Sequence, residues 1–295
     1  MPSFAPRPVF AVPIAHGGVL HLGERTLVMG ILNVSPDSFA NTAPLHAPAD
    51  AVAAALRMEA DGADLIDIGG ESTRPGADAI SVDEELSRVM PVLVALGGRL
   101  RVPISIDTYK AEVAREAVAT GAALVNDVSG LGRDAQMGRV VAETGAGLIL
   151  MHARGSSKTM YAEARYEDVV LEVVDELRAS IRTAMAAGVL LERVIVDPGV
   201  GFAKRPSHSY VVLARLPELA AALGRPVLVG PSRKSFLLAA VGGRPAQERD
   251  WGTAAAIAAA VLAGANIVRV HAVAEMVQVV RVTEEIRRAG LEAQS

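Results

Sequence analysis

Arg269 and His271 lie two residues apart at the end of a short aliphatic run, and together they form a candidate anion site. Side chains at positions i and i+2 of a β-strand point to the same side of the sheet. A guanidinium and an imidazole that face the same way both offer N–H donors to phosphate or carboxylate oxygens. The pattern therefore predicts a site for an anionic group of a substrate.

The segment Gly230–Ser235, with the sequence Gly-Pro-Ser-Arg-Lys-Ser, supplies further donors. It is typical of a turn followed by the start of a helix, where exposed backbone amides bind anions. Arg233 and Lys234 add positive charge to this turn. A solvated basic loop would have the same composition and is an alternative interpretation. Lys234 is also compatible with a Schiff-base lysine, as in barrel aldolases.

Asp107 and Asp197 each follow an aliphatic run. A pair of carboxylates can serve as the acid and the nucleophile of a glycosidase, but only 3% of the residues are aromatic, which leaves few rings to stack on sugars. The pairs Asn126-Asp127 and Ser72-Thr73 also follow such runs. Polar residues in that position often cap the next helix, so each of them has a structural alternative to a functional role.

Eight short aliphatic runs alternate with Ala-rich stretches of helical character, which is the pattern of βα units in a parallel sheet. Eight units in a chain of this length match a (β/α)8 TIM barrel, whose active site lies at the carboxyl ends of the strands. A doubly wound open sheet is the alternative, but no glycine-rich dinucleotide motif follows the first run. The predicted strands are Leu27–Leu32, Leu65–Ile68, Val102–Ile106, Leu124–Val125, Leu148–Met151, Val194–Val196, Val227–Val229 and Ile267–Val270.

The residues before the first of these strands are predicted to form a β-hairpin. Its strands are Val9–Ala15 and Val19–Leu22, with a turn at His16–Gly18. The segment lacks the apolar core and small-residue cleavage site of a secretory signal. We therefore expect an N-terminal hairpin extension over residues 1–26 and one barrel domain over residues 27–290.

The composition restricts the class of protein further. The chain has 295 residues, of which 51% are hydrophobic and 21% charged, and its net charge of −4 disfavours nucleic-acid binding. Its most hydrophobic stretch, Gly252–Ala265, is shorter than the roughly 18 residues of a membrane span. The absence of cysteine excludes disulfides and thiolate metal ligands and favours a cytoplasmic location, and any metal must be bound through oxygen or imidazole.

Seven motifs along the chain together resemble those of the dihydropteroate synthase family. They follow one another through all eight predicted strands, over about residues 27–290. The motifs are Met29–Phe39 (MGILNVSPDSF), Asp67–Gly76 (DIGGESTRPG), Ser105–Thr108 (SIDT), Asn126–Gly130 (NDVSG), Asp197–Phe202 (DPGVGF), Ser232–Lys234 (SRK) and Arg269–His271 (RVH).

The resemblance implies a barrel enzyme that joins 6-hydroxymethyl-7,8-dihydropterin diphosphate to p-aminobenzoate and yields 7,8-dihydropteroate for folate synthesis. Breaking the bond to diphosphate builds negative charge on the leaving group and positive charge on the pterin methylene, and the site must stabilise both. No covalent nucleophile is required, in agreement with a sequence that lacks cysteine. The catalytic residues implied by the resemblance are Asp107, Lys234, Arg269 and His271.

The resemblance also assigns residues to a metal ion and to the pterin diphosphate. Asn33 is the implied ligand of Mg²⁺, with diphosphate oxygens and water completing the coordination. The residues that match diphosphate contacts are Thr73, Arg269 and His271. Those that match the pterin pocket are Asn126, Asp197 and Lys234, with Asp107 placed against the pterin, where its charge favours a developing cation.

For the second substrate, the resemblance implies an apolar slot and an anion site. Arg74, Pro75 and Phe202 match the mobile-loop residues that form the slot, and Ser235 at a helix start suits the carboxylate of p-aminobenzoate. The loops after the first two barrel strands are expected to close once diphosphate is present. Binding should therefore be ordered, with the pterin first.

The sequence departs from the family pattern at three places. Ala40–Pro44 replaces the acidic, glycine-rich turn that is usual after Phe39 and is expected to be stiffer. Ala272 stands where the family usually has an aspartate after His271. The stretch Met151–Gly155 keeps only part of the usual pattern, so the resemblance gives no catalytic role to His152.

Two other functions share part of this pattern. A corrinoid-type methyltransferase has the same barrel and the Asn and Asp pterin contacts, but it does not need an Arg-His diphosphate clamp and works with a cobalamin module. A non-catalytic paralogue would bind pterin without turnover, and the intact Thr73, Arg74 and Lys234 argue against it. The expected partners are the two small-molecule substrates and no nucleic acid or membrane.

The family also implies a homodimer, formed through helices late in the chain. Ala254–Ala263 is a small-residue stretch compatible with close helix packing, although an ordinary buried helix is the alternative interpretation.

Overall fold

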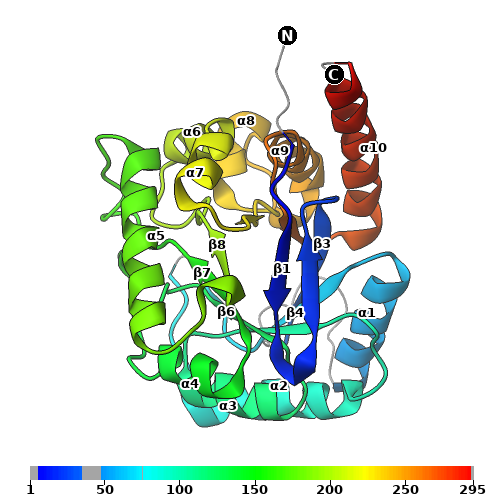
Figure 1. The fold of residues 1–295 in the computed structure, drawn as a ribbon, viewed down its shortest axis with the longest axis vertical. Coiled ribbons are helices and arrows are strands. Elements are labelled where there is room, and N and C mark those ends of the chain that lie inside the picture. Colours follow the sequence, from blue (N-terminus) through cyan, green and yellow to red (C-terminus); the bar gives the residue numbers. More distant parts are fainter. Residues whose placement is uncertain (1–5, 35–47, 75, 294–295) are drawn as a thin grey trace.

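A computed structural model describes residues 6–34, 48–74 and 76–293. Within these ranges, eight parallel strands form a barrel with helices around its outside (Figure 1). The strand order is β8-β7-β6-β5-β4-β3-β10-β9, and a single parallel bridge between Val196 and Val227 joins the two ends of the sheet. The TIM barrel predicted from the aliphatic runs is confirmed.

The barrel strands coincide with the predicted runs to within two residues at every end. They are β3 (Leu27–Asn33), β4 (Leu65–Gly69), β5 (Ile104–Asp107), β6 (Leu124–Asp127), β7 (Gly147–Met151), β8 (Val194–Asp197), β9 (Leu228–Val229) and β10 (Ile267–Val270). Every residue of β7 is buried. Strands covered on both faces bury consecutive side chains, which explains why they are continuous aliphatic runs and do not alternate with polar residues.

The helices contact one another in succession around the barrel. They are α1 (Pro48–Ala60), α2 (Val82–Leu96), α3 (Ala111–Ala119), α4 (Met137–Thr144), α5 (Val169–Ala186), α6 (Pro206–Ala214), α7 (Leu216–Leu223), α8 (Leu238–Val241), α9 (Asp250–Leu262) and α10 (Val273–Glu292). None of the helices in the described ranges is both long enough and apolar enough to cross a membrane.

Local signals in the sequence fix several of these helix ends. Ser81 precedes α2 and accepts the Glu84 N–H at 3.1 Å, and Asp168 precedes α5 and accepts the N–H groups of the second and third following residues. Both are N-caps that satisfy amides with no partner inside the helix. At the other end of α4, Gly145 has a φ of 69° and donates its N–H to Val141 O, as a left-handed C-cap does.

The predicted N-terminal hairpin is also present. β1 (Phe10–Pro13) pairs antiparallel with β2 (Val19–Leu22) across a short 3₁₀ turn, Ala15–Gly17. Apolar hairpin residues such as Val12 and Leu20 pack against residues near the starts of the barrel strands, such as Leu124. The hairpin therefore closes the end of the barrel opposite to the carboxyl ends of the strands. Because it shares a core with the barrel, the division of the chain at residue 27 stays a prediction.

Candidate active site

Polar side chains from four strands, three of them buried and Arg269 partly exposed, meet toward the carboxyl ends of the barrel strands. Arg269 on β10 donates from Nε to Asp67 Oδ2 and from Nη2 to Asp107 Oδ2, each at 2.6 Å. Asn126 on β6 donates from Nδ2 to the same Asp67 oxygen at 2.9 Å. The barrel thus brings Asp107, Asn126 and Arg269 together: Asp67 joins Asn126 to Arg269, and Arg269 binds Asp107 directly.

Burial controls the charges in this group. It raises the pKa of Asp107 to about 7, although the nearby Arg269 guanidinium acts in the opposite direction. Burial also disfavours the charged form of Arg269, but Asp67 and Asp107 outweigh that effect and its pKa is raised. The site therefore holds a permanent cation beside a carboxyl group that titrates near neutral pH, a combination frequent at catalytic sites.

Asp197 and Lys234 form a second part of the site, around the loop that follows β8. Asp197 ends β8 and accepts the Gly199 N–H at 2.7 Å; burial raises its pKa, and Lys234 is the main opposing charge. Lys234 donates from Nζ to Val200 O at 2.8 Å and lies 4.4 Å from the centre of the Phe202 ring. Burial lowers the pKa of Lys234 to about 8.

His271 is held by the turn after β9. Its Nδ1 lies 2.9 Å from Ser232 Oγ, which also accepts the His271 backbone N–H at 3.1 Å. Burial, with Arg233 as the strongest nearby charge, lowers the pKa of His271 to about 3. The imidazole is therefore neutral at neutral pH and carries one N–H donor.

The turn that carries Arg233 and Lys234 is ordered by specific contacts. Arg233 has a φ of 59°, and its backbone N–H is accepted by Thr253 Oγ1 at 3.0 Å. Its guanidinium binds Asp250 through Nε and Nη2, at 2.8 and 2.7 Å. Lys234 is half-buried and its amine donates to Val200 O, so specific contacts hold both basic side chains of this turn, and they are not freely solvated.

A cavity of about 420 Å³ lies beside this polar group. Its lining comes from the loops after β4 to β8 and includes Thr73, Tyr109, Arg133, Arg154 and Phe202. The volume is within the range of small-molecule sites. Two of the expected substrate contacts, Thr73 and Phe202, line this cavity.

The remaining predicted site residues lie around the same end of the barrel, at the carboxyl ends of the strands. Asn33 ends β3, in register with Gly69 of β4. Arg74 is exposed, yet near enough to His271 to lower the pKa of that imidazole. Ser235 begins a short 3₁₀ helix, Ser235–Leu237, and its Oγ lies 3.0 Å from the hydroxyl of Tyr161. Pro75 and the altered segment Ala40–Pro44 lie outside the described residues.

Comparison with known proteins places the chain in a family. Residues 29–271 match the family described as pterin binding enzyme. A dihydropteroate synthase from Synechocystis is 45% identical over 280 residues, which cover 95% of this chain and 96% of that protein. The Escherichia coli enzyme of the same name is 44% identical over 257 residues, covering 87% and 90%. This chain belongs to the dihydropteroate synthase family.

Solved dihydropteroate synthases have the same fold. The Yersinia pestis protein, in a complex with a sulfonamide drug, superposes with a TM-score of 0.88 at 41% identity and covers 93% of this chain and 98% of its own. The Burkholderia cenocepacia protein, in a complex with 7,8-dihydropteroate, superposes with a TM-score of 0.86 at 45% identity, covering 97% and 99%.

Two buried residues of this family member were not among the predicted site residues. Asp67 is fully buried between Arg269 and Asn126, and an acidic residue inside an aliphatic strand was a usable signal for it. Lys204 is 1% exposed and donates to His152 Nδ1, and its sequence context carries no comparable signal. By contrast, Asp127 accepts the backbone N–H groups of Ser129 and Leu131 and so stabilises the turn after β6, but it does not cap the next helix, α4, whose N-cap is Gln136.

Proposed function

We infer that this chain is a dihydropteroate synthase, a transferase that condenses 6-hydroxymethyl-7,8-dihydropterin diphosphate with p-aminobenzoate to give 7,8-dihydropteroate and diphosphate. The enzymes from Synechocystis and Escherichia coli carry that name. The observation in this molecule that carries the inference is the pair of half-buried Arg269 with buried Asp107. One cation and one titratable carboxyl group are held 2.6 Å apart toward the carboxyl ends of the strands in a pterin-binding barrel.

The buried acceptors and donors suit a pterin ring. A pterin offers amino and amide N–H groups along one edge and a carbonyl oxygen beside them. We assign Asp197 to accept from the N–H groups, with Asn126 beside it, and Lys234 to donate to the carbonyl and N5 edge. Because burial raises the pKa of Asp197, N–H donors from a bound ring would stabilise its charged form.

The leaving group needs donors that strengthen as charge develops on it. We assign Arg269, His271 and Thr73 to the diphosphate. Within the described residues, the two hydrogen bonds of Arg269 to carboxylates use Nε and Nη2, and Nη1 is left to bind substrate. If the Ser232 hydroxyl donates to His271 Nδ1, the ring proton lies on Nε2 and is available to a phosphate oxygen.

In the bond-forming step, the aromatic amine attacks the pterin methylene, the carbon to diphosphate bond breaks, and the amine loses a proton. We assign Asp107 to stabilise the positive charge that develops on the pterin. Phe202, which lies under Lys234 and lines the cavity, is assigned to one wall of the p-aminobenzoate slot, with Arg74 and Pro75 on the loop after β4. Ser235 is assigned to the carboxylate of that substrate.

We propose Mg²⁺ as the metal, with Asn33 as its protein ligand. A neutral amide oxygen is a hard donor of the kind that Mg²⁺ prefers, and Asn33 ends β3 as the one residue of that strand that is not buried. The described residues contain no group of three acidic or histidine side chains able to hold a metal ion. The diphosphate would therefore supply much of the coordination, and the bound ion would neutralise charge on the leaving group.

We also propose a homodimer formed through α9 and α10, which pack against each other. Trp251 on α9 is 89% exposed, and Ala255 and Ala259 are exposed one and two turns later. Val282 and Ile286 are exposed on α10. Light scattering should give the mass of a dimer for the native chain and of a monomer for Trp251→Glu, while Leu190→Glu, at an exposed site elsewhere, should leave the mass unchanged.

We further propose a cytoplasmic location, in keeping with a chain that has no cysteine.

The reaction is tested with the purified protein and Mg²⁺. p-Aminobenzoate is titrated calorimetrically with and without pterin and diphosphate, and dihydropteroate is then assayed after addition of pterin diphosphate. Binding of p-aminobenzoate only when diphosphate is present, followed by product formation, is the expected result. Binding of the pterin with no dihydropteroate formed would contradict the proposed reaction.

A further inference from the structure

We propose that Lys204 is a positioning residue for p-aminobenzoate, because it fixes the loop of residues 198–205, which carries Phe202, to the end of β7 through His152. The inference rests on the proposed function, since Phe202 is assigned there to the slot for this substrate. It concerns a lysine that does not itself line the cavity among the described residues.

Lys204 is a buried amine with two identified acceptors. Its side chain is 1% exposed, and Nζ donates to His152 Nδ1 at 2.8 Å and to Phe202 O at 3.2 Å. Burial lowers the pKa of Lys204 to about 7, although Asp197 opposes that effect. A buried amine has lost its hydration and depends on its protein acceptors for hydrogen bonds. It therefore holds them in a defined geometry.

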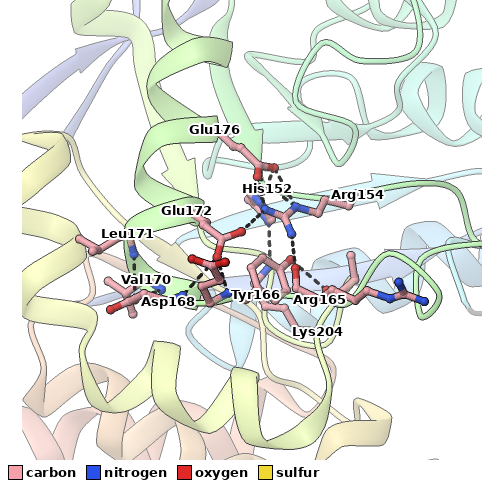
Figure 2. Close-up of polar contacts among 12 residues, drawn as sticks. His152, Arg154, Arg165, Tyr166, Asp168, Val170, Leu171, Glu172, Glu176 and Lys204 are labelled. Carbon is pink, nitrogen blue, oxygen red and sulfur yellow. Dashed lines mark hydrogen bonds and ion pairs between the residues drawn. The ribbon is translucent and has the colours of Figure 1, made fainter.

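His152 is a firm anchor for that amine, as Figure 2 shows. Its backbone N–H donates to Asp197 O at 2.9 Å, and its Nε2 lies 3.0 Å from Glu176 Oε2 on α5. Burial lowers the pKa of His152 to about 4, so the ring is neutral. Since Nδ1 accepts from the lysine, the ring proton lies on Nε2 and is donated to Glu176. Arg154 binds the other oxygen of Glu176 through Nε at 3.0 Å.

The loop itself needs such anchors. Gly199 has a φ of 67° and approaches the His152 carbonyl so closely that a Cβ would lie 2.0 Å from its oxygen, and Ala203 has a φ of 47°. A non-glycine residue in this region is strained and persists only where the surroundings hold it. Three carbonyls of the loop are each held by a side chain: Val200 O by Lys234, Phe202 O by Lys204 and Ala203 O by the Tyr166 hydroxyl at 2.9 Å.

Loss of the Lys204 anchor should act on one substrate more than on the other. Phe202 lines the cavity and depends on the loop for its position. Asp197, assigned to the pterin, ends β8, and its backbone carbonyl accepts the His152 N–H at 2.9 Å, so its position is set by the paired strands and not by the loop alone. Displacement of the loop near Phe202 would therefore impair the p-aminobenzoate slot more than the pterin site, because Asn126 and Asp197 lie on strands.

The test compares Michaelis constants in Lys204→Met, which keeps the side-chain length and removes the donor. We expect the KM for p-aminobenzoate to rise roughly tenfold, while the KM for pterin diphosphate and kcat change by less than about twofold. Tyr166→Phe removes only the hydroxyl bound to Ala203 O and should show the same pattern more weakly. Arg215→Met is the matched control, because Arg215 binds the N-cap residue Asp168 of α5 at 2.9 Å and does not touch the loop.

An unchanged KM for p-aminobenzoate in Lys204→Met, or equal losses for both substrates, would overturn the inference and leave Lys204 a structural residue only. If Lys204→Met does not fold, Tyr166→Phe decides by the same comparison. Failure of the proposed function is a separate outcome, since the native enzyme itself would then form no dihydropteroate.

Discussion

Arg269 and Asp67 are joined across β3 by a hydrogen bond of 2.6 Å, so the guanidinium assigned to the diphosphate is fixed by a fully buried carboxylate on β4. The other oxygen of Asp67 has no hydrogen-bond partner among the described residues. A buried carboxylate with one unsatisfied oxygen depends strongly on its cation. In this pair, Asp67 fixes the position of the Arg269 guanidinium, and Arg269 compensates the buried negative charge of Asp67.

Removal of Arg269 should for this reason reduce stability as well as activity. Arg269→Leu leaves Asp67 and Asp107 without their cation, and we expect the free energy of unfolding to fall by about 3–5 kcal/mol. Addition of Asp67→Asn should restore part of that loss, because one of the two stranded charges is removed. Urea unfolding at pH 7 measures the free energy of unfolding of the single variant and of the double variant. Arg244→Leu, at an exposed ion pair with Glu248, should cost no more than about 1 kcal/mol. Native stability in Arg269→Leu would contradict the argument.

The raised pKa of Asp107 predicts an acid limb in the activity profile. If the ionised carboxylate stabilises the developing cation, protonation removes that effect. kcat/KM should therefore be constant above the pKa of about 7 and fall about tenfold for each pH unit below it. Asp107→Asn should have low activity without this limb, and the variant thus separates the titration of Asp107 from the ionisation of the substrates. The same limb in Asp107→Asn would assign the titration to another group.

The sequence was sufficient to predict the barrel because its strands are covered on both faces and form unbroken aliphatic runs. Residue type and position alone could not distinguish the adjacent residues Asn126 and Asp127, and only the family resemblance selected Asn126. Both lie at the end of β6, but successive side chains of a strand point to opposite sides. Asn126 reaches Asp67 in the interior, whereas Asp127 binds the following turn. Which of the two faces inward depends on how the strand is placed in the closed sheet, and this is not a local property of the chain.

The role of Lys204 could not be predicted from the sequence, for a different reason. Its partner His152 is 52 residues away, and the contact exists because the loop after β8 adopts positive φ angles at Gly199 and Ala203. Glycine at 199 permits a positive φ, but the residue type of Ala203 does not indicate one, and no periodicity encodes the path of the loop. Asp67 is different, since a lone acid in the strand Leu65–Gly69 indicates a partnered buried charge, although not which cation pairs with it.

The assignment of Mg²⁺ to Asn33 predicts a metal requirement linked to diphosphate. EDTA should abolish product formation, and Mg²⁺ should restore it. Asn33→Leu should raise the Mg²⁺ concentration for half-maximal activity by roughly tenfold or more, equivalent to about 1.4 kcal/mol, whereas Asn33→Asp retains an oxygen ligand and should raise it less. Binding of a pterin without diphosphate should be equal in all three proteins. Equal Mg²⁺ dependence of the native enzyme and Asn33→Leu would remove Asn33 from the metal site.

Ala272 predicts a gain in stability. It is the N-cap of α10 and makes no side-chain bond to the amides of the first turn. An aspartate there accepts such an amide and places negative charge at the positive end of the helix dipole. Ala272→Asp should therefore raise the free energy of unfolding by about 1 kcal/mol in urea. Ala272→Asn should give a similar gain without the charge, which separates the hydrogen bond from the dipole, and Ala272→Leu should give none. Equal stability of the Asp and Leu variants would show that the first turn of α10 already has its amides satisfied by other means.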